Sequence, residues 1–227
     1  MLQLAAACAS THGWGTVMII LTNGHDMLQR DAQDWSQFVV LLIDVQRSFW
    51  PTERGQLFPH VADNIRRLLT FCRTAHLDVV HVRSRFQPDM SDWMPPFKVR
   101  QSTPCIEGTP GIATLPFAIE HPQEPVMFKH TLDGFHNPAL LAYLQQHNKR
   151  FVLTAGLVTS TCVLFTTASA MQHGFLTAVV EDCCADHPDA HTRTLAQYGF
   201  IFGRTTVAQL SARYLGWCGT LRALDPV

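Results

Sequence analysis

The chain has 227 residues, of which 47% are hydrophobic and only 15% are charged. This is enough apolar material for one sizeable core, so one globular domain is expected. The formal net charge is -1, and lysine and arginine form no cluster. The composition therefore argues against nucleic acid and against an anionic membrane surface as partners.

Seven cysteines are spaced irregularly and contain no Cys-x-x-Cys pair. This pattern fits neither a disulfide framework nor a zinc ribbon, and it favours a reducing, cytoplasmic setting. The N-terminal "MLQLAAACAS" lacks a basic segment, and "VMIIL" is too short to cross a bilayer. No membrane segment is expected.

Hydrophobic periodicity predicts alternating strands and helices from Phe38 onward. The run "FVVLLIDV" is typical of a strand buried on both faces of a parallel sheet. A helical pattern follows from Pro59 to His76, and it leads into a second strand, "DVVHVRSR". Residues 86–124 are rich in proline and glycine, which predicts a long and functionally important loop.

The alternation resumes with the short strand "PVMFK" and with a helix in which Asn137 precedes Pro138. The next predicted elements are the strand "RFVLTAG", a helix over 160–172, the strand "LTAVVED", a helix over 188–198 and a short strand near "FIFG". This order predicts an α/β fold with a doubly wound, mostly parallel sheet in three layers. We expect an N-terminal extension over residues 1–35 and a single domain over 36–227.

Three ionisable residues follow or end predicted strands: Asp44, Lys129 and Cys162. Ligands of an open parallel sheet bind beyond the carboxyl ends of its strands, so these side chains are expected to converge. A thiol in the first turn of a helix is stabilised as the thiolate, and a nearby ammonium lowers its pKa further. We therefore expect Cys162 to be alkylated below about pH 8.

The motifs "LLIDVQRSF", "CIEGTPG", "FKHTLDGFHNPALLAYL" and "GLVTSTCVLFTTASAMQHGF" resemble those of the isochorismatase-like cysteine hydrolases, in the same order. The resemblance covers residues 38–207 and implies that family's Rossmann-like fold. It implies a triad of Asp44 as acid and base, Lys129 as cation and Cys162 as nucleophile. It also implies a cis bond between Leu157 and Val158, with the Val158 and Cys162 N–H groups forming an oxyanion hole.

The resemblance implies hydrolysis of a C–N bond in a small amide or ureido compound, through a thioester and without a cofactor. Members that hydrolyse the vinyl ether of isochorismate lack a cysteine at this position, so Cys162 favours amidase chemistry. A catalytically idle scaffold, an isochorismatase-type ether hydrolase and a thiol redox sensor remain alternatives. Related chains form dimers or larger assemblies, so a homo-oligomer, dimer or tetramer, is expected, with residues 208–224 as an interface helix.

No metal is expected. Nicotinamidase-type members carry an aspartate and a histidine where this chain has Ser84 and Phe86. His187 and His191 have helical i, i+4 spacing beside two aspartates, but the sequence offers no evident third ligand.

The substrate-binding candidates lie at or just after strand ends. Arg83 or Arg85 could pair with a substrate carboxylate, with an ordinary surface ion pair as the alternative. Aromatic residues could wall a pocket and exclude water, or belong to the core. These aromatic candidates are Phe49, Trp50, Trp93 and Phe135.

Overall fold

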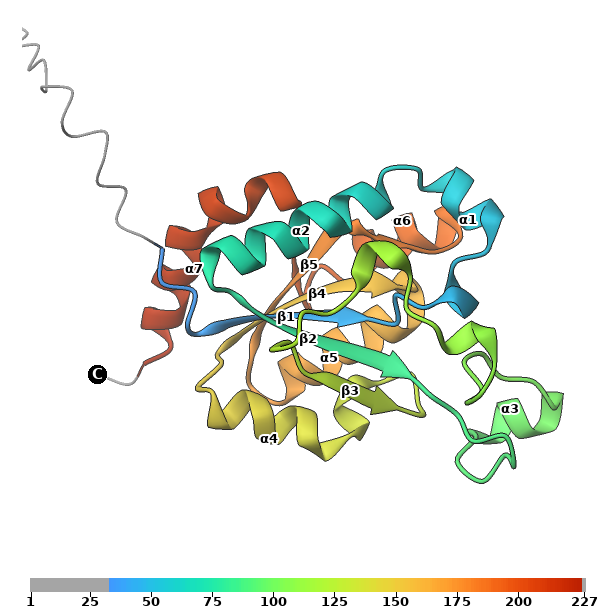
Figure 1. Cartoon of the computed structure of the whole chain (residues 1–227). Helices are drawn as coiled ribbons and strands as arrows, with labels where there is room; N and C mark the ends of the chain where they lie inside the picture. Colours follow the sequence, from blue (N-terminus) through green and yellow to red (C-terminus); the bar gives the residue numbers. More distant parts are fainter. Residues whose placement is uncertain (1–32, 226–227) are drawn as a thin grey trace, which may run out of the picture. The chain divides into compact units, whose positions relative to one another are not determined.

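The computed structural model describes residues 33–225. These residues form one six-stranded, all-parallel sheet with helices on both of its faces (Figure 1). The strand order is β3-β2-β1-β4-β5-β6, so the chain builds outward from β1 in one direction and from β4 in the other. This order confirms the doubly wound α/β prediction and makes the β1–β4 boundary the topological switch point. The strands are β1 (Phe38–Ile43), β2 (Asp78–Ser84), β3 (Val126–Lys129), β4 (Phe151–Leu157), β5 (Leu176–Ala185) and β6 (Gly203–Thr205).

Helices cover both faces of the sheet (Figure 1). One face carries α2 (Val61–Ala75) and α7 (Leu210–Ala223). The other carries α4 (Pro138–Gln146), α5 (Leu164–Gln172) and α6 (Pro188–Gln197). The short helices are α1 (Thr52–Leu57) and α3 (Pro95–Arg100). None of the helices in the described part of the chain is both long and apolar enough to cross a membrane.

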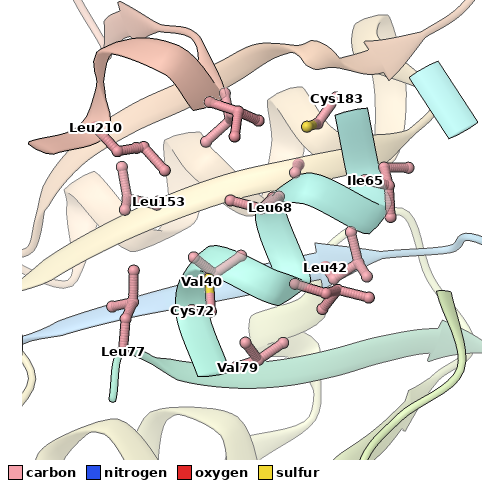
Figure 2. Close-up of a cluster of buried hydrophobic side chains, with 14 of the residues drawn as sticks. Val40, Leu42, Ile65, Leu68, Cys72, Leu77, Val79, Leu153, Cys183 and Leu210 are labelled. Carbon is pink, nitrogen blue, oxygen red and sulfur yellow. The ribbon is translucent and has the colours of Figure 1, made fainter. Parts of the chain in front are cut away.

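Strand β1 is buried along its whole length because its alternate side chains enter two different cores. Val40 and Leu42 pack with the apolar side of α2, which includes Ile65 and Leu68 (Figure 2). Val39, Leu41 and Ile43 pack with α4 and α5 on the opposite face. This explains why the sequence of β1 is a continuous apolar run rather than an alternating one.

Helix α7 packs on the sheet of its own chain. Its Trp217 lies 4.9 Å from Phe151, and its Tyr214 lies 4.8 Å from Trp35, measured between ring centroids. Trp35, which the sequence placed in the N-terminal extension, is 2% exposed and belongs to this core. The rest of that extension, residues 1–32, lies outside the described residues.

The structure differs from the sequence-based expectations in three elements. The predicted helix over 160–172 begins as a π-helical turn, Thr159–Val163, before α5. The last strand begins at Gly203 rather than near Phe200, whose side chain is 81% exposed. The loop over 86–124 contains α3, because Pro95 and Pro96 occupy the first helical positions, where a missing N–H is tolerated.

Candidate active site

The candidate site lies where the carboxyl ends of β1, β3 and β4 meet. Asp44 follows the last residue of β1, and Lys129 is the last residue of β3. Cys162 lies in the π-helical turn Thr159–Val163, which begins just after β4. The turn therefore presents the thiol at the switch point between β1 and β4.

The side chains of Asp44, Lys129 and Cys162 are brought together by this arrangement. Lys129 Nζ lies 2.8 Å from Asp44 Oδ2 and 3.5 Å from Cys162 Sγ. Asp44 is 0%, Lys129 1% and Cys162 3% exposed. All three residues are therefore almost completely screened from water.

Ser84 connects the carboxylate and the ammonium of this cluster. Its N–H donates to Asp44 Oδ1 at 2.7 Å, and its Oγ accepts a hydrogen bond from Lys129 Nζ at 2.9 Å. Lys129 Nζ also donates to the Thr131 carbonyl at 2.8 Å. Ammonium groups have three N–H donors, and those of Lys129 go to Ser84 Oγ, the Thr131 carbonyl and Cys162 Sγ, while Asp44 Oδ2 makes an ion pair at 2.8 Å. The sequence indicated Ser84 only as the residue that stands in place of a metal ligand, and it did not predict this role.

Gln46 holds Ser84 from the other side. Its Oε1 accepts the Ser84 N–H at 2.9 Å, and its Nε2 donates to the Ser84 carbonyl at 2.9 Å and to the Ile112 carbonyl at 3.0 Å. Gln46 is completely buried. The only sequence signal for Gln46 was its position two residues after Asp44. Hydrophobic periodicity predicts which residues are buried, but it does not predict their hydrogen-bond partners.

Burial dominates the ionisation of Cys162. It raises the pKa of the thiol to about 12, with Asp44 raising it further and Lys129 opposing both. The expected low-pKa thiol is therefore wrong, because the surrounding chain removes water from the sulfur and a carboxylate faces it. Burial alone would lower the pKa of Lys129, but Asp44 and Cys162 raise it above its ordinary value. The arrangement thus holds a neutral thiol beside a charged ammonium.

The chain between β4 and Cys162 contains a cis peptide bond, between Leu157 and Val158. The Val158 carbonyl accepts the N–H groups of Thr161 at 3.2 Å and Val163 at 3.3 Å. Within the described residues, the Val158 N–H has no hydrogen-bond acceptor. This N–H is therefore available to a ligand, as an oxyanion-hole donor must be.

The two arginine candidates are occupied by carboxylates of the chain. Arg83 forms an ion pair with Glu120. Arg85 lies 3.7 Å from Glu107, and its guanidinium stacks 4.0 Å from the centre of the Phe128 ring. These contacts correspond to the surface ion pairs that the sequence left open as an alternative.

The aromatic candidates separate into different surroundings. Phe135 is 8% exposed and belongs to the same buried cluster as Cys162. Phe49 and Trp50 pack at the edge of the core on the other face of the sheet. Trp93 is 6% exposed, and its indole N–H donates to the Gln87 carbonyl at 2.7 Å. The Phe135 ring packs 5.2 Å from the His173 ring and 6.2 Å from the Phe175 ring, beyond the end of α5 that is remote from Cys162, so membership of this cluster does not place it at the thiol.

The two histidines considered for metal binding have other contacts. His191 Nδ1 lies 2.8 Å from Thr159 Oγ1, and the backbone N–H of His187, rather than its ring, donates to Asp186. Across residues 33–225, no cluster of three or more His, Cys, Asp or Glu side chains could hold a metal ion.

The isochorismatase domain model matches residues 38–208, which include all three converging side chains. The chain belongs to the isochorismatase family. This isochorismatase-family hydrolase is 29% identical to maleamate amidohydrolase of Pseudomonas putida over 182 residues, which cover 75% of the chain and 84% of the relative.

Two solved structures share its fold. A cysteine hydrolase from Pseudomonas syringae pv. phaseolicola superposes with a TM-score of 0.71 at 22% identity, covering 82% of this chain and 96% of the other. N-carbamoylsarcosine amidase from Thermoplasma acidophilum superposes with a TM-score of 0.63 at 20% identity, covering 75% and 96%.

Proposed function

We propose that this isochorismatase-family hydrolase is a cysteine-dependent amidohydrolase that cleaves the C–N bond of a small, non-peptide amide or ureido compound. The observation that carries the proposal is the buried contact of Lys129 Nζ with both Asp44 Oδ2 and Cys162 Sγ. A nucleophile, a proton acceptor and a fixed positive charge are the parts that such a reaction requires. The similarity to maleamate amidohydrolase supports an amide as the bond that is cleaved.

In the first step, the carboxylate of Asp44 takes the proton of the Cys162 thiol as the sulfur attacks the amide carbon. The raised pKa of Cys162, which results mainly from burial, means that the thiol rests protonated and needs this base. Lys129 pairs with Asp44 and balances the negative charge that enters the site. The N–H groups of Val158 and Cys162 receive the oxyanion of the tetrahedral intermediate.

In the second step, Asp44 returns the proton to the leaving nitrogen, the C–N bond breaks, and ammonia or an amine departs. The acyl group then remains on Cys162 as a thioester. Water attacks this thioester while Asp44 takes a proton from the water, and the C–S bond breaks. The released acid and the regenerated thiol complete the cycle, with Asp44 acting as base and acid in turn.

Ammonia or amine release from a panel of small amides tests the proposal. The panel contains maleamate, nicotinamide, N-carbamoylsarcosine and ureidoacrylate, each offered to wild type, Cys162→Ala and Cys218→Ala. Cys218 is a partly exposed cysteine on α7 and serves as the matched control. We expect turnover that Cys162→Ala abolishes and Cys218→Ala preserves. Turnover that survives Cys162→Ala, or no turnover of any compound, contradicts the proposal.

A further inference from the structure

The π-helical turn Thr159–Val163 is held from outside by the segment that follows β5. Leu157 of β4 pairs with Ala185 of β5, so Asp186 emerges beside Val158 and the start of the turn. Asp186 Oδ2 accepts two hydrogen bonds from Ser160, from the backbone N–H at 2.8 Å and from Oγ at 2.6 Å. The other oxygen, Oδ1, accepts the His187 N–H at 2.7 Å. Both carboxylate oxygens are thus fixed, and the aspartate is 8% exposed.

A second contact ties the same turn to α6. Thr159 Oγ1 lies 2.8 Å from His191 Nδ1, and the His191 ring in turn packs 5.2 Å from the Phe58 ring. Burial lowers the pKa of His191, so its neutral form is favoured in this contact. The two residues at the start of the turn are therefore both attached to the segment 186–191.

Val163 of the turn shares a buried apolar cluster with Leu195 of α6, but Ser160 borders open space. A cavity of about 490 Å³ opens beside it and is lined by Ser160, Leu164, His187 and Arg193, among others. Because water can enter such a cavity, the hydrogen bonds to Asp186 are the specific restraints on Ser160. The positive charge of Arg54 partly balances the charge of Asp186. Burial lowers the pKa of Arg54, and the attraction of Asp186 opposes this effect.

We infer that Asp186 is a positioning residue for the reaction: it holds the turn so that the N–H groups of Val158 and Cys162 meet the oxyanion. Ser160 lies between these two donors, and Asp186 binds the Ser160 N–H directly. A displacement of about 1 Å in such a site can reduce the rate about a hundredfold, so a restraint at this point acts on the transition state more than on substrate binding. This inference rests on the function proposed above.

The test compares wild type with Asp186→Ala and Asp186→Asn on the amide that the panel identifies. Asp186→Asn keeps an oxygen that accepts from Ser160 but loses the charge and one acceptor. Asp182→Asn is the matched control, because Asp182 lies in β5, in the same stretch of chain, and likewise accepts a backbone N–H, that of Val207 at 3.1 Å, away from the turn. Thermal unfolding of each variant identifies those that are folded.

The readouts are kcat, KM and inhibition by the aldehyde analogue of the substrate. The Cys162 thiol adds to the carbonyl of the aldehyde and forms a thiohemiacetal. The oxygen of this thiohemiacetal occupies the oxyanion position. We expect Asp186→Ala to lower kcat about tenfold to a hundredfold, to weaken aldehyde inhibition by a similar factor and to leave KM within about threefold. Asp186→Asn should lose less than Asp186→Ala, and Asp182→Asn should match wild type.

A folded Asp186→Ala with kcat within twofold of wild type overturns the inference, and so does a loss of kcat without weaker aldehyde inhibition. If Asp186→Ala does not fold, the same comparison is made with Asp186→Asn, where an unchanged kcat and unchanged aldehyde inhibition overturn it. Each of these outcomes overturns only the role of Asp186, because each is measured against an active wild type. An inactive wild type instead refutes the proposed function.

Discussion

Lys129 and Asp44 form a completely buried ion pair, with 2.8 Å between Nζ and Oδ2. Removing one partner of such a pair leaves an uncompensated charge away from water, which typically destabilises a protein by about 3 to 5 kcal/mol. We expect Lys129→Met and Asp44→Asn each to lower the free energy of unfolding by about this amount. The double variant should lose less than the sum of the two, because neither charge is then left alone.

Urea unfolding of the three variants at neutral pH measures these free energies. Arg193→Ala is the control, because its ion pair with Asp189 is exposed and is expected to contribute only about 0.5 kcal/mol. Strictly additive losses in the double variant would show that the pair is not coupled. All three variants at the buried pair should be inactive as amidohydrolases.

The raised pKa of Cys162 predicts slow alkylation. Because burial and Asp44 hold the thiol protonated, with a pKa near 12, iodoacetamide should modify Cys162 more slowly than Cys218 at pH 7. The rate at Cys162 should still be rising above about pH 9, where an ordinary thiol is already largely ionised. Peptide mapping by mass spectrometry measures both sites in one sample. A plateau in the Cys162 rate below about pH 8 would contradict the burial argument.

Ser84 provides a smaller test of the same cluster. Ser84→Ala removes the acceptor of one Lys129 N–H while the backbone bond to Asp44 remains. A buried donor without an acceptor costs about 1 to 3 kcal/mol, so the free energy of unfolding should fall by that amount. Ser91→Ala is the comparison, because the Ser91 hydroxyl binds Asp89 at the surface. Equal effects of the two substitutions would mean that Ser84 has no special role in orienting Lys129.

The candidate triad could be located from sequence because it depends on strand ends. Parallel strands present their carboxyl ends at one edge, and the apolar runs that end at Asp44 and before Cys162 are unambiguous. The partners of Arg83 and Arg85 could not be located, since Glu120 and Glu107 lie in the loop over 86–124. Periodicity does not predict the path of such a loop.

The sequence-based prediction of a low pKa for Cys162 was wrong for a related reason. Its helix position and its lysine neighbour were readable from sequence, and both favour the thiolate. Its desolvation is the larger effect, and it arises because Cys162 lies in a buried apolar cluster with residues of β1 and β2, which are distant in sequence. Asp186 was missed likewise, because only the pairing of Leu157 with Ala185 brings it to the turn.

Gly156 allows close contact between β4 and β1. Its φ is 121°, and a Cβ at this position would lie 2.0 Å from the Ile43 carbonyl oxygen. We expect Gly156→Ala to lower the free energy of unfolding by more than about 4 kcal/mol, since backbone atoms cannot move aside as a flexible side chain can. Gly174→Ala is the control: φ is 89° there, but a Cβ would meet no atom within 4 Å. Circular dichroism during thermal unfolding compares the two, and similar melting temperatures would contradict the prediction.

We expect the contribution of Glu124 to the free energy of unfolding to depend on pH. Burial alone would raise its pKa, but bonds from Arg73, the His121 N–H and His81 together lower the pKa to about 2, from an ordinary value of 4.5. The unfolded state therefore binds a proton first as the pH falls, so the stabilisation is complete above pH 4.5 and is lost as the pH falls toward 2. Because water still screens part of this carboxylate, the contribution is about 1 to 2 kcal/mol, less than the full shift would give. Urea unfolding of wild type and Glu124→Gln should show a difference that is constant near neutral pH and shrinks below pH 4.5. Glu107→Gln removes a glutamate that is 45% exposed and should show a smaller difference. A Glu124→Gln difference that does not change with pH would mean that its shape, rather than its charge, stabilises the fold.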